Sequence, residues 1–513
     1  MNLAKQIMHI IRTTLFFNGS GIIRRVRPQR SYYGLSINRK NMRKYMILLV
    51  LLTSALTGFS KIELGTQFSD NMVLQQSAKI KIAGKTSTVG KVTVTTGWGK
   101  TYKATADKQG KFTVTIETPK AGGPYDINLD DGEQTVLKNI LIGEVWLAVG
   151  QSNMVMPVKG FDAKQLVVNR QEMEQHASKL PPIRFLTLES PPSEEVSDLV
   201  LGKWVAADAQ SVANFSAVAY EFARTLQEEL KVPVGIIVAA NSGTRIESWM
   251  SKGSLESIAD KFLDLDRPFQ KNSAAAMYNA MIAPLLGYQI KGFLWYQGEA
   301  NRMSPGAYLK QFPAMLDDWR KSWGGKDLPF YTVEIAPFPY PTDKDKAYIA
   351  AFFRENQRKL SRTLAQVGIV STVDVGSSTT VHPPDKTKVG TRLALLALGQ
   401  TYGFKERYQE SVYKGYSTDG DKISITFSGN NRLQLLGDTL QDMEIAGEDQ
   451  VFHPANATLQ GDRLLVWSAA VAHPKSVRYC FKAYSVGNLF TEHGLPVPPF
   501  RTDNWSIIQK KTP

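Results

Sequence analysis

The amino-acid sequence predicts an α/β domain between two regions that are built mainly from β-strands. In residues 141–405, apolar runs typical of buried strands alternate with segments of helical periodicity. Residues 61–140 and 406–513 instead carry short alternating strand patterns separated by turn residues. A chain of 513 residues has room for about three domains, and we expect them in this order.

The first sixty residues predict a targeting segment. A basic stretch at 42–45 precedes eleven apolar residues at 46–56, and small residues at 57–60 are typical of a cleavage site. Eleven residues are too few to span a bilayer. We therefore expect residues 42–60 to be a secretory signal peptide and residues 1–41 to be an extension from a start codon assigned too far upstream. The mature chain is then expected outside the cytoplasm (secreted, periplasmic or at the cell surface), without membrane insertion.

The charge and cysteine content exclude two classes of site. Ten of the fourteen net positive charges lie in residues 1–45, which leaves +4 for the rest and gives no support for a nucleic-acid partner. Cys480 is the single cysteine, so neither an intrachain disulfide nor a cysteine-based zinc site can form. Its alternating apolar surroundings predict a buried hydrophobic residue and not a nucleophile.

The two flanking regions read as β-domains. In the N-terminal region we expect turns at 83–84, 107–110 and 122–124, and a β-sandwich of about eighty residues. No helical period interrupts the N-terminal region. The expected strands are 79–83 and 91–95 in the N-terminal region and 422–427, 432–436 and 463–467 in the C-terminal region.

The central region contains the α/β signature. The apolar spacing predicts a helix over 215–226. Buried strands are expected at 143–149, 234–240, 290–296 and 367–373. Polar residues follow the last three, at 241–244, 297–301 and 374–376, and the carboxyl ends of parallel strands are where open α/β sheets form their sites.

The segment from Gly150 to Met154 is the most informative in the chain. A buried strand, a glycine turn and a helix start would hold the Ser152 hydroxyl at the sheet edge beside backbone N–H groups. Such groups can stabilise the oxyanion of an acyl-transfer reaction. A lone serine in this position is more often a helix cap, so the assignment as a nucleophile depends on a nearby base.

His382 is the candidate base. Of the six histidines, it is the one that follows a strand and loop within the α/β region, ahead of a predicted helix at 390–398. We expect donors for the oxyanion from the 241–244 turn and from the 297–301 segment.

Three sequence blocks together resemble the sialate O-acetylesterase family of SGNH-type esterases. They are Gly143-Glu-Val-Trp with Gly150-Gln-Ser-Asn-Met154, Trp295-Tyr-Gln-Gly-Glu-Ala-Asn301, and His382-Pro with Lys386 and Val389-Gly-Thr-Arg-Leu393. The resemblance extends over about residues 62–507, through 68–75, 121–125 and 500–505. It implies a flavodoxin-like three-layer α/β/α domain flanked by β-sandwich-like domains. It also implies hydrolysis of O-acetyl esters of sugars, with no metal and no cofactor.

The resemblance assigns roles to individual residues. Ser152 becomes the nucleophile and His382 the base, and Gly243 matches the second glycine of a Gly-Gly-Thr turn in which Ser242 replaces the first. Gln297 or Asn301 is expected to complete the oxyanion hole, with Gln297 favoured because it follows the strand directly. The further residues expected to contact substrate are Gln151, Glu299 and Arg245, and a sialate carboxylate would require an arginine such as Arg245 or Arg302.

The acid that orients the histidine is missing from its usual position. These esterases place an aspartate three residues before the histidine, where this chain has Thr379. Asp374 is our favoured replacement, with Glu299, Asp385 and a backbone carbonyl as alternatives, although Asp385 also suits the first turn of a helix.

Two alternatives to a sugar acetylesterase follow. The missing acid and Ser242 favour a carbohydrate-binding protein whose esterase site has decayed. A hydrolase of lipid esters or thioesters is the other, but a lipid substrate usually requires an apolar lid, and no such insertion is evident. The acetylated glycan (sialic acid, xylan, pectin or another) and the oligomeric state stay open.

Overall fold

Six parallel strands form the centre of the structure. The structure is a computed structural model, and it describes residues 62–87, 90–258, 268–325, 327–341, 348–429 and 431–506. The predicted extension 1–41 and signal peptide 42–60 lie outside these residues. The antiparallel strand β10 (Gly202–Ala206) forms one edge of this part of the sheet. The parallel strands follow in the order β9 (Ile183–Leu188), β11 (Val234–Ala240), β8 (Gln134–Gly150), β12 (Gly292–Tyr296), β13 (Phe330–Val333) and β14 (Val367–Val370).

The strand order reverses at β8. From β8 the chain first adds strands on the β11 side and then returns to add β12 on the other side. Gly150, the last residue of β8, pairs with Ala240 of β11 and with Tyr296 of β12. Open parallel sheets bind ligands at the carboxyl edge where the strand order reverses, so residues just after Gly150 lie at the position the topology favours.

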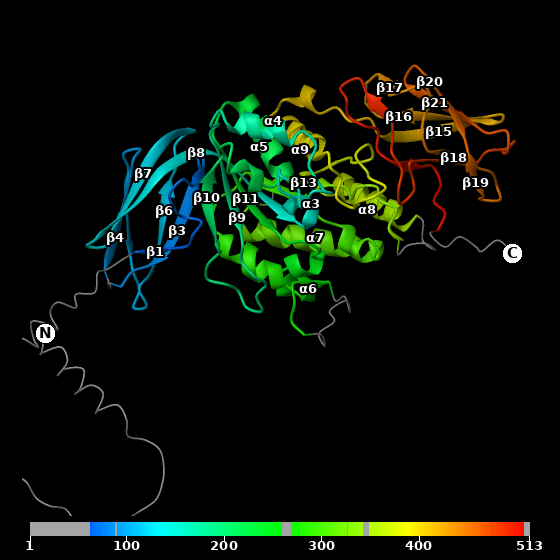
Figure 1. Ribbon diagram of the computed structural model, residues 1–513. Coiled ribbons are helices and arrows are strands. Elements are labelled where there is room, and N and C mark those ends of the chain that lie inside the picture. The colour runs from blue at the N-terminus through cyan, green and yellow to red at the C-terminus, as the bar shows by residue number, and fades with distance from the viewer. Residues whose placement is uncertain are drawn as a thin grey trace, which may run out of the picture. The chain divides into compact units, whose positions relative to one another are not determined.

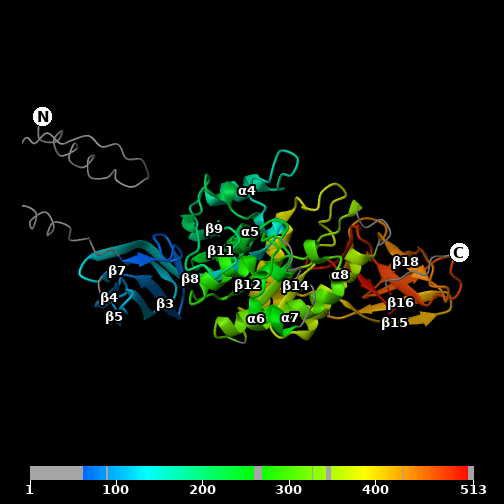
Figure 2. The ribbon, with the colours of Figure 1, turned by 90° about the horizontal axis from the view of Figure 1, so that it is seen from below.

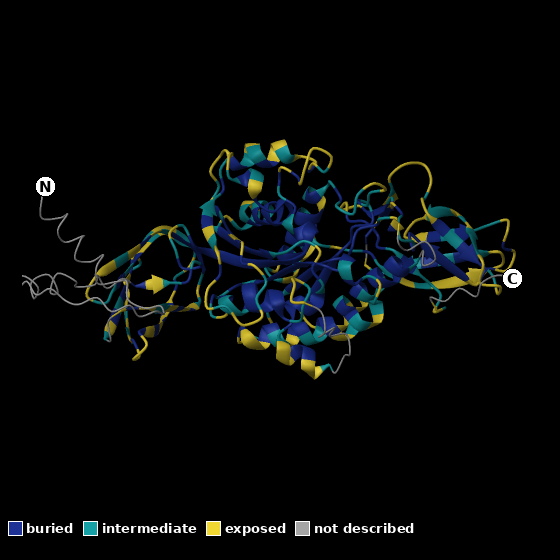
Figure 3. Cartoon of the chain, turned by 60° about the horizontal axis from the view of Figure 1, so that its bottom comes forward, coloured by how far each residue is buried: buried dark blue, intermediate teal, exposed yellow. Residues whose placement is uncertain are grey.

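Alternating side chains of β8 contribute to two separate hydrophobic cores. Trp146 and Ala148 pack in the core that contains α5 (Ala217–Leu230) and α9 (Lys386–Gln400). Leu147 and Val149 pack in the core that contains α7 (Pro305–Ser322) and α8 (Ile349–Thr363). Because both faces are covered, the central strands are buried along their length (Figure 3). The shorter helices include α3 (Ser152–Val155), α4 (Arg170–Ala177), α6 (Lys252–Ser257) and the single turns η2 (Ile246–Trp249), η3 (Tyr278–Ile282) and η5 (Glu299–Asn301).

The N-terminal β-region shares a strand with this sheet. Its first sheet pairs β1 (Glu63–Leu64), β3 (Lys79–Lys85) and β6 (Lys111–Glu117), and β3 and β6 alternate buried with solvent-facing residues. The early part of β8 pairs with β2 (Val73–Gln75) and β7 (Gly122–Asp130), and β7 pairs with β4 (Lys91–Thr96), which in turn pairs with β5 (Thr101–Thr105). β8 therefore runs unbroken from the β-region to the nucleophile turn.

The C-terminal β-region, orange to red in Figures 1 and 2, forms three small sheets around a core of its own. A partly exposed ion pair attaches it to α8, because Arg501 of β24 donates to both carboxylate oxygens of Glu355 at 2.8 and 2.9 Å. The strands are β15 (Tyr413–Asp419), β16 (Lys422–Phe427), β20 (Asn456–Gln460) and β21 (Arg463–Trp467); β17 (Leu433–Leu435) and β23 (Leu489–Thr491); and β18 (Met443–Ala446), β19 (Phe452–Pro454), β22 (Ser476–Tyr479) and β24 (Phe500–Arg501).

The predicted mixed α/β class is confirmed, and several local expectations are corrected. The predicted turn at 122–124 is the start of β7, where the register shifts, and Gly84 lies inside β3. Cys480 is buried as predicted, and burial raises its pKa to about 12, which leaves the thiol unreactive. No helix within the described residues is long and apolar enough to cross a membrane.

Candidate active site

Ser152 lies in the turn that the sequence predicts. Gly150 has a φ of 152°, and a Cβ at this residue would stand 2.1 Å from the carbonyl oxygen of Tyr296. Glycine therefore allows β12 to approach the end of β8. Ser152 opens helix α3, so its own N–H has no intrahelical acceptor.

His382 is within hydrogen-bonding distance of Ser152. Its Nε2 lies 2.8 Å from Ser152 Oγ, although the two residues are far apart in the sequence. The ring is half-buried in the loop before α9, and Thr380 Oγ1 accepts a hydrogen bond from the His382 backbone N–H at 3.1 Å. Burial, and then the charge of Lys386, lowers the pKa of His382 to about 4. The imidazole is therefore neutral at pH 7 and can accept the serine proton.

Gln165 occupies the position on the other ring nitrogen that an acid was expected to fill. Its Oε1 lies 2.7 Å from His382 Nδ1 and also accepts a hydrogen bond from Thr380 Oγ1 at 3.3 Å. Phe161, from the same loop, packs edge-on against the imidazole with ring centroids 5.0 Å apart. Sequence reasoning missed this contact, because the loop has neither periodicity nor a charged residue type to single out Gln165.

The prediction that Asp374 orients His382 is wrong. Its two carboxylate oxygens accept hydrogen bonds from Arg392 at 2.7 and 2.8 Å, and Lys388 Nζ lies 3.3 Å from the second. Burial alone would raise the pKa of Asp374, but the hydrogen bonds and charge of Arg392, aided by Lys388, lower it. Asp374 is part of a structural ion pair.

The alternative acids are also used elsewhere. Asp385 accepts a hydrogen bond from the Lys388 N–H at 3.1 Å as the N-cap of α9. Glu299 accepts one from Asn153 Nδ2 at 2.5 Å. Thr379, which stands where the acid is expected, donates its backbone N–H to Ser377 Oγ at 3.2 Å, and its hydroxyl lies 3.3 Å from the same oxygen.

Gln297 is not available to bind an oxyanion. It is fully buried, and both N–H bonds of its amide are used, by Thr244 O at 3.1 Å and by Asn301 Oδ1 at 2.7 Å. Asn301 in turn donates to Glu247 Oε2 at 2.9 Å and accepts from the Ile246 N–H. These two side chains tie the end of β12 to the segment after β11, so the expectation that Gln297 donates to the oxyanion is corrected.

The turn after β11 keeps a free backbone donor. Gly243 has a φ of 71°, and its N–H has no acceptor among the described residues. Asn272 Nδ2 and Lys271 Nζ fix the turn from outside by donating to the carbonyl oxygens of Gly243 and Ser242. Ser242 has no positive φ, so a serine here does not strain the turn.

The remaining predicted residues have structural partners. Gln151 is buried, and its Oε1 accepts from the N–H groups of Gly298 and Ala300, both at 3.4 Å. Arg245 donates to Glu247 Oε1 at 2.9 Å, with its side chain 40% exposed. Arg302 donates to the Glu299 carbonyl oxygen and lies over the Tyr340 ring.

A buried charged cluster lies behind the nucleophile. Lys386 Nζ donates to Asn153 Oδ1, and Asn153 donates to Glu299. Burial lowers the pKa of Lys386 to about 7, although the charge of Glu299 opposes this. Burial likewise raises the pKa of Glu299. Neighbouring Tyr296 has a hydroxyl with no hydrogen-bond partner in the described part of the chain.

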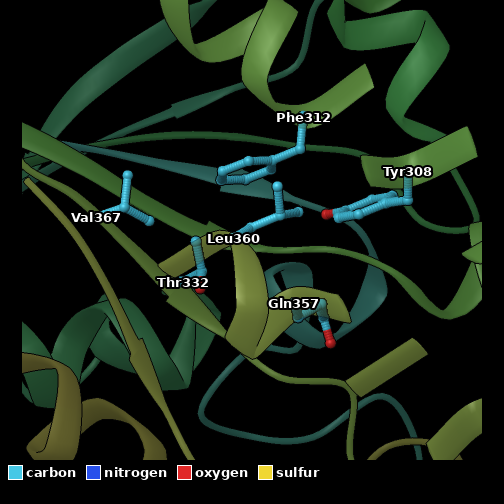
Figure 4. A pocket seen from close by; sticks show the side chains of 6 residues that line it. All are labelled: Tyr308, Phe312, Thr332, Gln357, Leu360 and Val367. Carbon is cyan, nitrogen blue, oxygen red and sulfur yellow. The ribbon is translucent and has the colours of Figure 1, made fainter. Parts of the chain in front are cut away.

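Two observations bear on other ligands. A small cavity between α7, α8 and the sheet is lined by Tyr308, Phe312, Thr332, Gln357, Leu360 and Val367, and none of these is a site residue (Figure 4). Across the described ranges, no group of three or more His, Cys, Asp and Glu side chains could hold a metal ion.

Comparison with known proteins gives consistent matches. Residues 142–399 match the family described as carbohydrate esterase, sialic acid-specific acetylesterase. The human sialate O-acetylesterase is 29% identical over 378 residues, which cover 66% of this chain and 70% of that protein. The rat enzyme is 25% identical over 508 residues, covering 84% and 93%. The crystal structure of a carbohydrate acetylesterase from Xanthomonas citri is 35% identical, with a TM-score of 0.78, and the match covers 87% of this chain and 100% of that one.

Proposed function

This chain belongs to the sialic acid-specific acetylesterase family of carbohydrate esterases and is a carboxylic ester hydrolase, and we propose that it removes O-acetyl groups from sugars through an acetyl-enzyme formed on Ser152. The observation that carries the proposal is the 2.8 Å contact between His382 Nε2 and Ser152 Oγ. A serine hydroxyl needs a base within this distance to become a nucleophile.

The first chemical step uses the neutral imidazole. His382 takes the hydroxyl proton while Ser152 Oγ attacks the acetyl carbonyl carbon. The low pKa of His382, about 4, keeps the ring unprotonated at neutral pH, so the base form is present before substrate arrives. The same low value makes the imidazolium a strong acid once it forms, and this favours transfer of its proton to the leaving alkoxide.

The tetrahedral oxyanion is held by backbone donors in this proposal. Ser152 N–H is one, because it opens a helix and has no intrahelical acceptor, and Gly243 N–H is the other. A single donor of this kind contributes about 10²–10³-fold to kcat. Loss of the carbon–oxygen bond then releases the sugar hydroxyl with the proton from His382. Water, deprotonated by His382, next attacks the acetyl carbonyl; the bond to Ser152 Oγ breaks, acetate leaves, and His382 returns the proton to Ser152 Oγ.

The substrate is a proposal at the level of acetylated glycans. The curated relatives carry the name sialate O-acetylesterase, and the Xanthomonas citri protein is described as a carbohydrate acetylesterase. Arg245 gives one of its five N–H groups to Glu247, its side chain is 40% exposed, and its Nε has no hydrogen-bond partner among the described residues, so it keeps donors for a sialate carboxylate. Acetylated sialic acid and neutral glycans such as acetylated xylan or pectin are therefore both carried into the assay.

The architecture is part of the same proposal. Helices in contact with both faces of a parallel sheet support the three-layer SGNH-type arrangement for residues 141–405. We propose residues 61–140 and 406–513 as the flanking β-domains.

Acetate release tests the function. Residues 61–513 would be assayed on p-nitrophenyl acetate and on acetylated sialic acid, xylan and pectin, beside Ser152→Ala. Release by the wild type that the Ser152→Ala variant lacks supports an acetyl-enzyme, and the preferred glycan identifies the substrate class. A folded wild type that releases nothing but binds one of the glycans would replace the esterase with the decayed-site binding protein.

A further inference from the structure

Gln165 is a neutral residue in a position where serine hydrolases usually have a carboxylate. A base histidine needs an acceptor at Nδ1, because that acceptor fixes the proton on Nδ1 and leaves Nε2 free to receive the serine proton. Gln165 Oε1, at 2.7 Å from His382 Nδ1, meets this need. Unlike a carboxylate, an amide could also turn over and offer its NH₂ group to Nδ1, which would fix the wrong tautomer.

Asp162, a solvent-exposed residue of the same loop, disfavours that reversal. Its Oδ2 accepts a hydrogen bond from Gln165 Nε2 at 3.3 Å, and a carboxylate can only accept. The carboxylate is itself held, because its Oδ1 accepts the backbone N–H groups of Lys164 at 2.7 Å and of Gln165 at 3.1 Å. The hydrogen bond from the Lys164 N–H is the main cause that lowers the pKa of Asp162 and keeps it ionised.

Thr380 favours the same orientation of the Gln165 amide. Its hydroxyl donates to Gln165 Oε1 and accepts from the His382 backbone N–H, so its one proton points at the amide oxygen. With Thr380 and Asp162 on its two ends, the amide has a single orientation that satisfies every partner: oxygen toward the histidine, nitrogen toward the acid.

The charges around His382 are unbalanced. Lys386 of α9 is the charged residue that acts on the ring directly, and it disfavours the imidazolium. Glu299 lies on the far side of Asn153, Asp374 and Asp385 are held by α9, and Asp162 is separated from the ring by the Gln165 amide. No carboxylate among the described residues contacts the imidazole.

We propose that Gln165, oriented by Asp162, is the positioning residue of the Ser152–His382 pair. Because this partner of His382 is neutral, the esterase keeps its activity at acidic pH values at which a histidine paired with a carboxylate would be protonated. The inference rests on the proposed function for its catalytic consequence, but the contact itself can be tested without turnover.

The sharpest variant exchanges the two groups. Asp162→Asn combined with Gln165→Glu moves the negative charge from position 162 to position 165, next to the imidazole. The net charge of the protein is unchanged, and the amide introduced at position 162 can donate a hydrogen bond to the new carboxylate. An opposite charge in contact raises a histidine pKa by about 1–3 units. We expect the His382 ring signals, followed by NMR in histidine-labelled protein, to titrate at least one pH unit higher than in the wild type. The acid limb of kcat/KM for p-nitrophenyl acetate should move by the same amount.

Three single variants complete the test. Gln165→Leu should lower kcat by about 10²–10³-fold with KM within threefold, because the imidazole loses its Nδ1 acceptor. Asp162→Asn should lower kcat less, because the amide can then reverse. The matched control is Asp421→Asn, an exposed aspartate in a turn of the C-terminal region, which should match the wild type.

The outcomes separate the two proposals. The proposed role of Gln165 is overturned if the wild type is active and Gln165→Leu keeps its kcat. It is also overturned if the His382 titration of the exchange variant does not move. A wild type that releases no acetate although the exchange variant shifts the titration overturns the esterase function and leaves the Gln165–His382 contact standing.

Discussion

The guanidinium of Arg392 bridges both carboxylate oxygens of Asp374 at 2.7 and 2.8 Å, and this pair connects the turn after β14 to helix α9. Both side chains are almost completely buried, at 6% and 4% exposed. Removal of one partner from a buried ion pair leaves the other charge uncompensated, at a cost of about 3 kcal/mol. We expect Asp374→Asn to lose about this much free energy of unfolding in urea denaturation, while kcat per folded molecule stays within threefold. A drop in kcat of a hundredfold without a loss of stability would restore Asp374 as the acid that orients His382.

The pH dependence of stability gives a second measurement on the same pair. The folded pKa of Asp374 is lowered, so its contribution is complete above the unfolded value of about 3.9 and is lost as the pH falls through the folded value. Wild-type stability should therefore fall below about pH 4, and the Asp374→Asn variant should show a shallower fall. Parallel slopes for the two proteins would show that Asp374 titrates normally.

Ser152→Ala should abolish the reaction and leave the fold intact. The hydroxyl is the atom that attacks in the proposed mechanism, and loss of a serine nucleophile costs about 10⁴-fold or more in kcat. The methyl side chain fits the same space, so the melting temperature should stay within about 2 °C. Mass spectrometry after mixing with p-nitrophenyl acetate should detect an acetyl group on the wild type and none on the variant; acetylation of the variant would place the nucleophile elsewhere.

Gly150→Ala tests the turn before the nucleophile. The new Cβ would stand 2.1 Å from the Tyr296 carbonyl oxygen, and a φ of 152° adds backbone strain. Since backbone atoms on two paired strands would have to separate, we expect a loss of about 2–4 kcal/mol in the free energy of unfolding. Gly253→Ala on α6 is the control, because nothing lies within 4 Å of its added Cβ. Equal stability of the two variants would contradict the close approach of β12.

Lys386→Met tests the charge behind the active site. The charge of Lys386 lowers the pKa of His382. Its removal should therefore raise the apparent pKa of the acid limb of the kcat/KM profile by about half a unit to one unit. Lys388→Met, two residues along α9, is the control, since Lys388 pairs with Asp374 and Asp385. An equal shift in both variants would mean that the effect is general and not specific to Lys386.

Stability should report on the same lysine. Its folded pKa of about 7 lies below the unfolded value of 10.5, so the unfolded chain binds more protons between these values. Wild-type stability should rise with pH in that window, and the Met variant should lack this rise.

Local patterns predicted the parts of the site that depend on local structure. The glycine turn after a buried strand and the histidine before a helix located Ser152 and His382, and strands such as β11, β16 and β21 fall where alternation or apolar runs predicted them. Gln165 could not be found this way, because it reaches His382 across 217 residues of sequence from an irregular loop. The roles of Gln297 and Asp374 were misassigned for the same reason: their partners Thr244 and Arg392 come from other elements.

The continuity of β8 limits how this enzyme can be divided or inherited. Residues 134–143 of the strand pair with β2 and β7, and residues 144–150 pair with β11 and β12 before the chain reaches Ser152. A fragment that starts at residue 141 would lack residues 134–140 of its own central strand and the β2 and β7 partners of residues 141–143. The N-terminal region is therefore not a separable unit, because replacing it would also replace the first half of the strand that leads to the nucleophile.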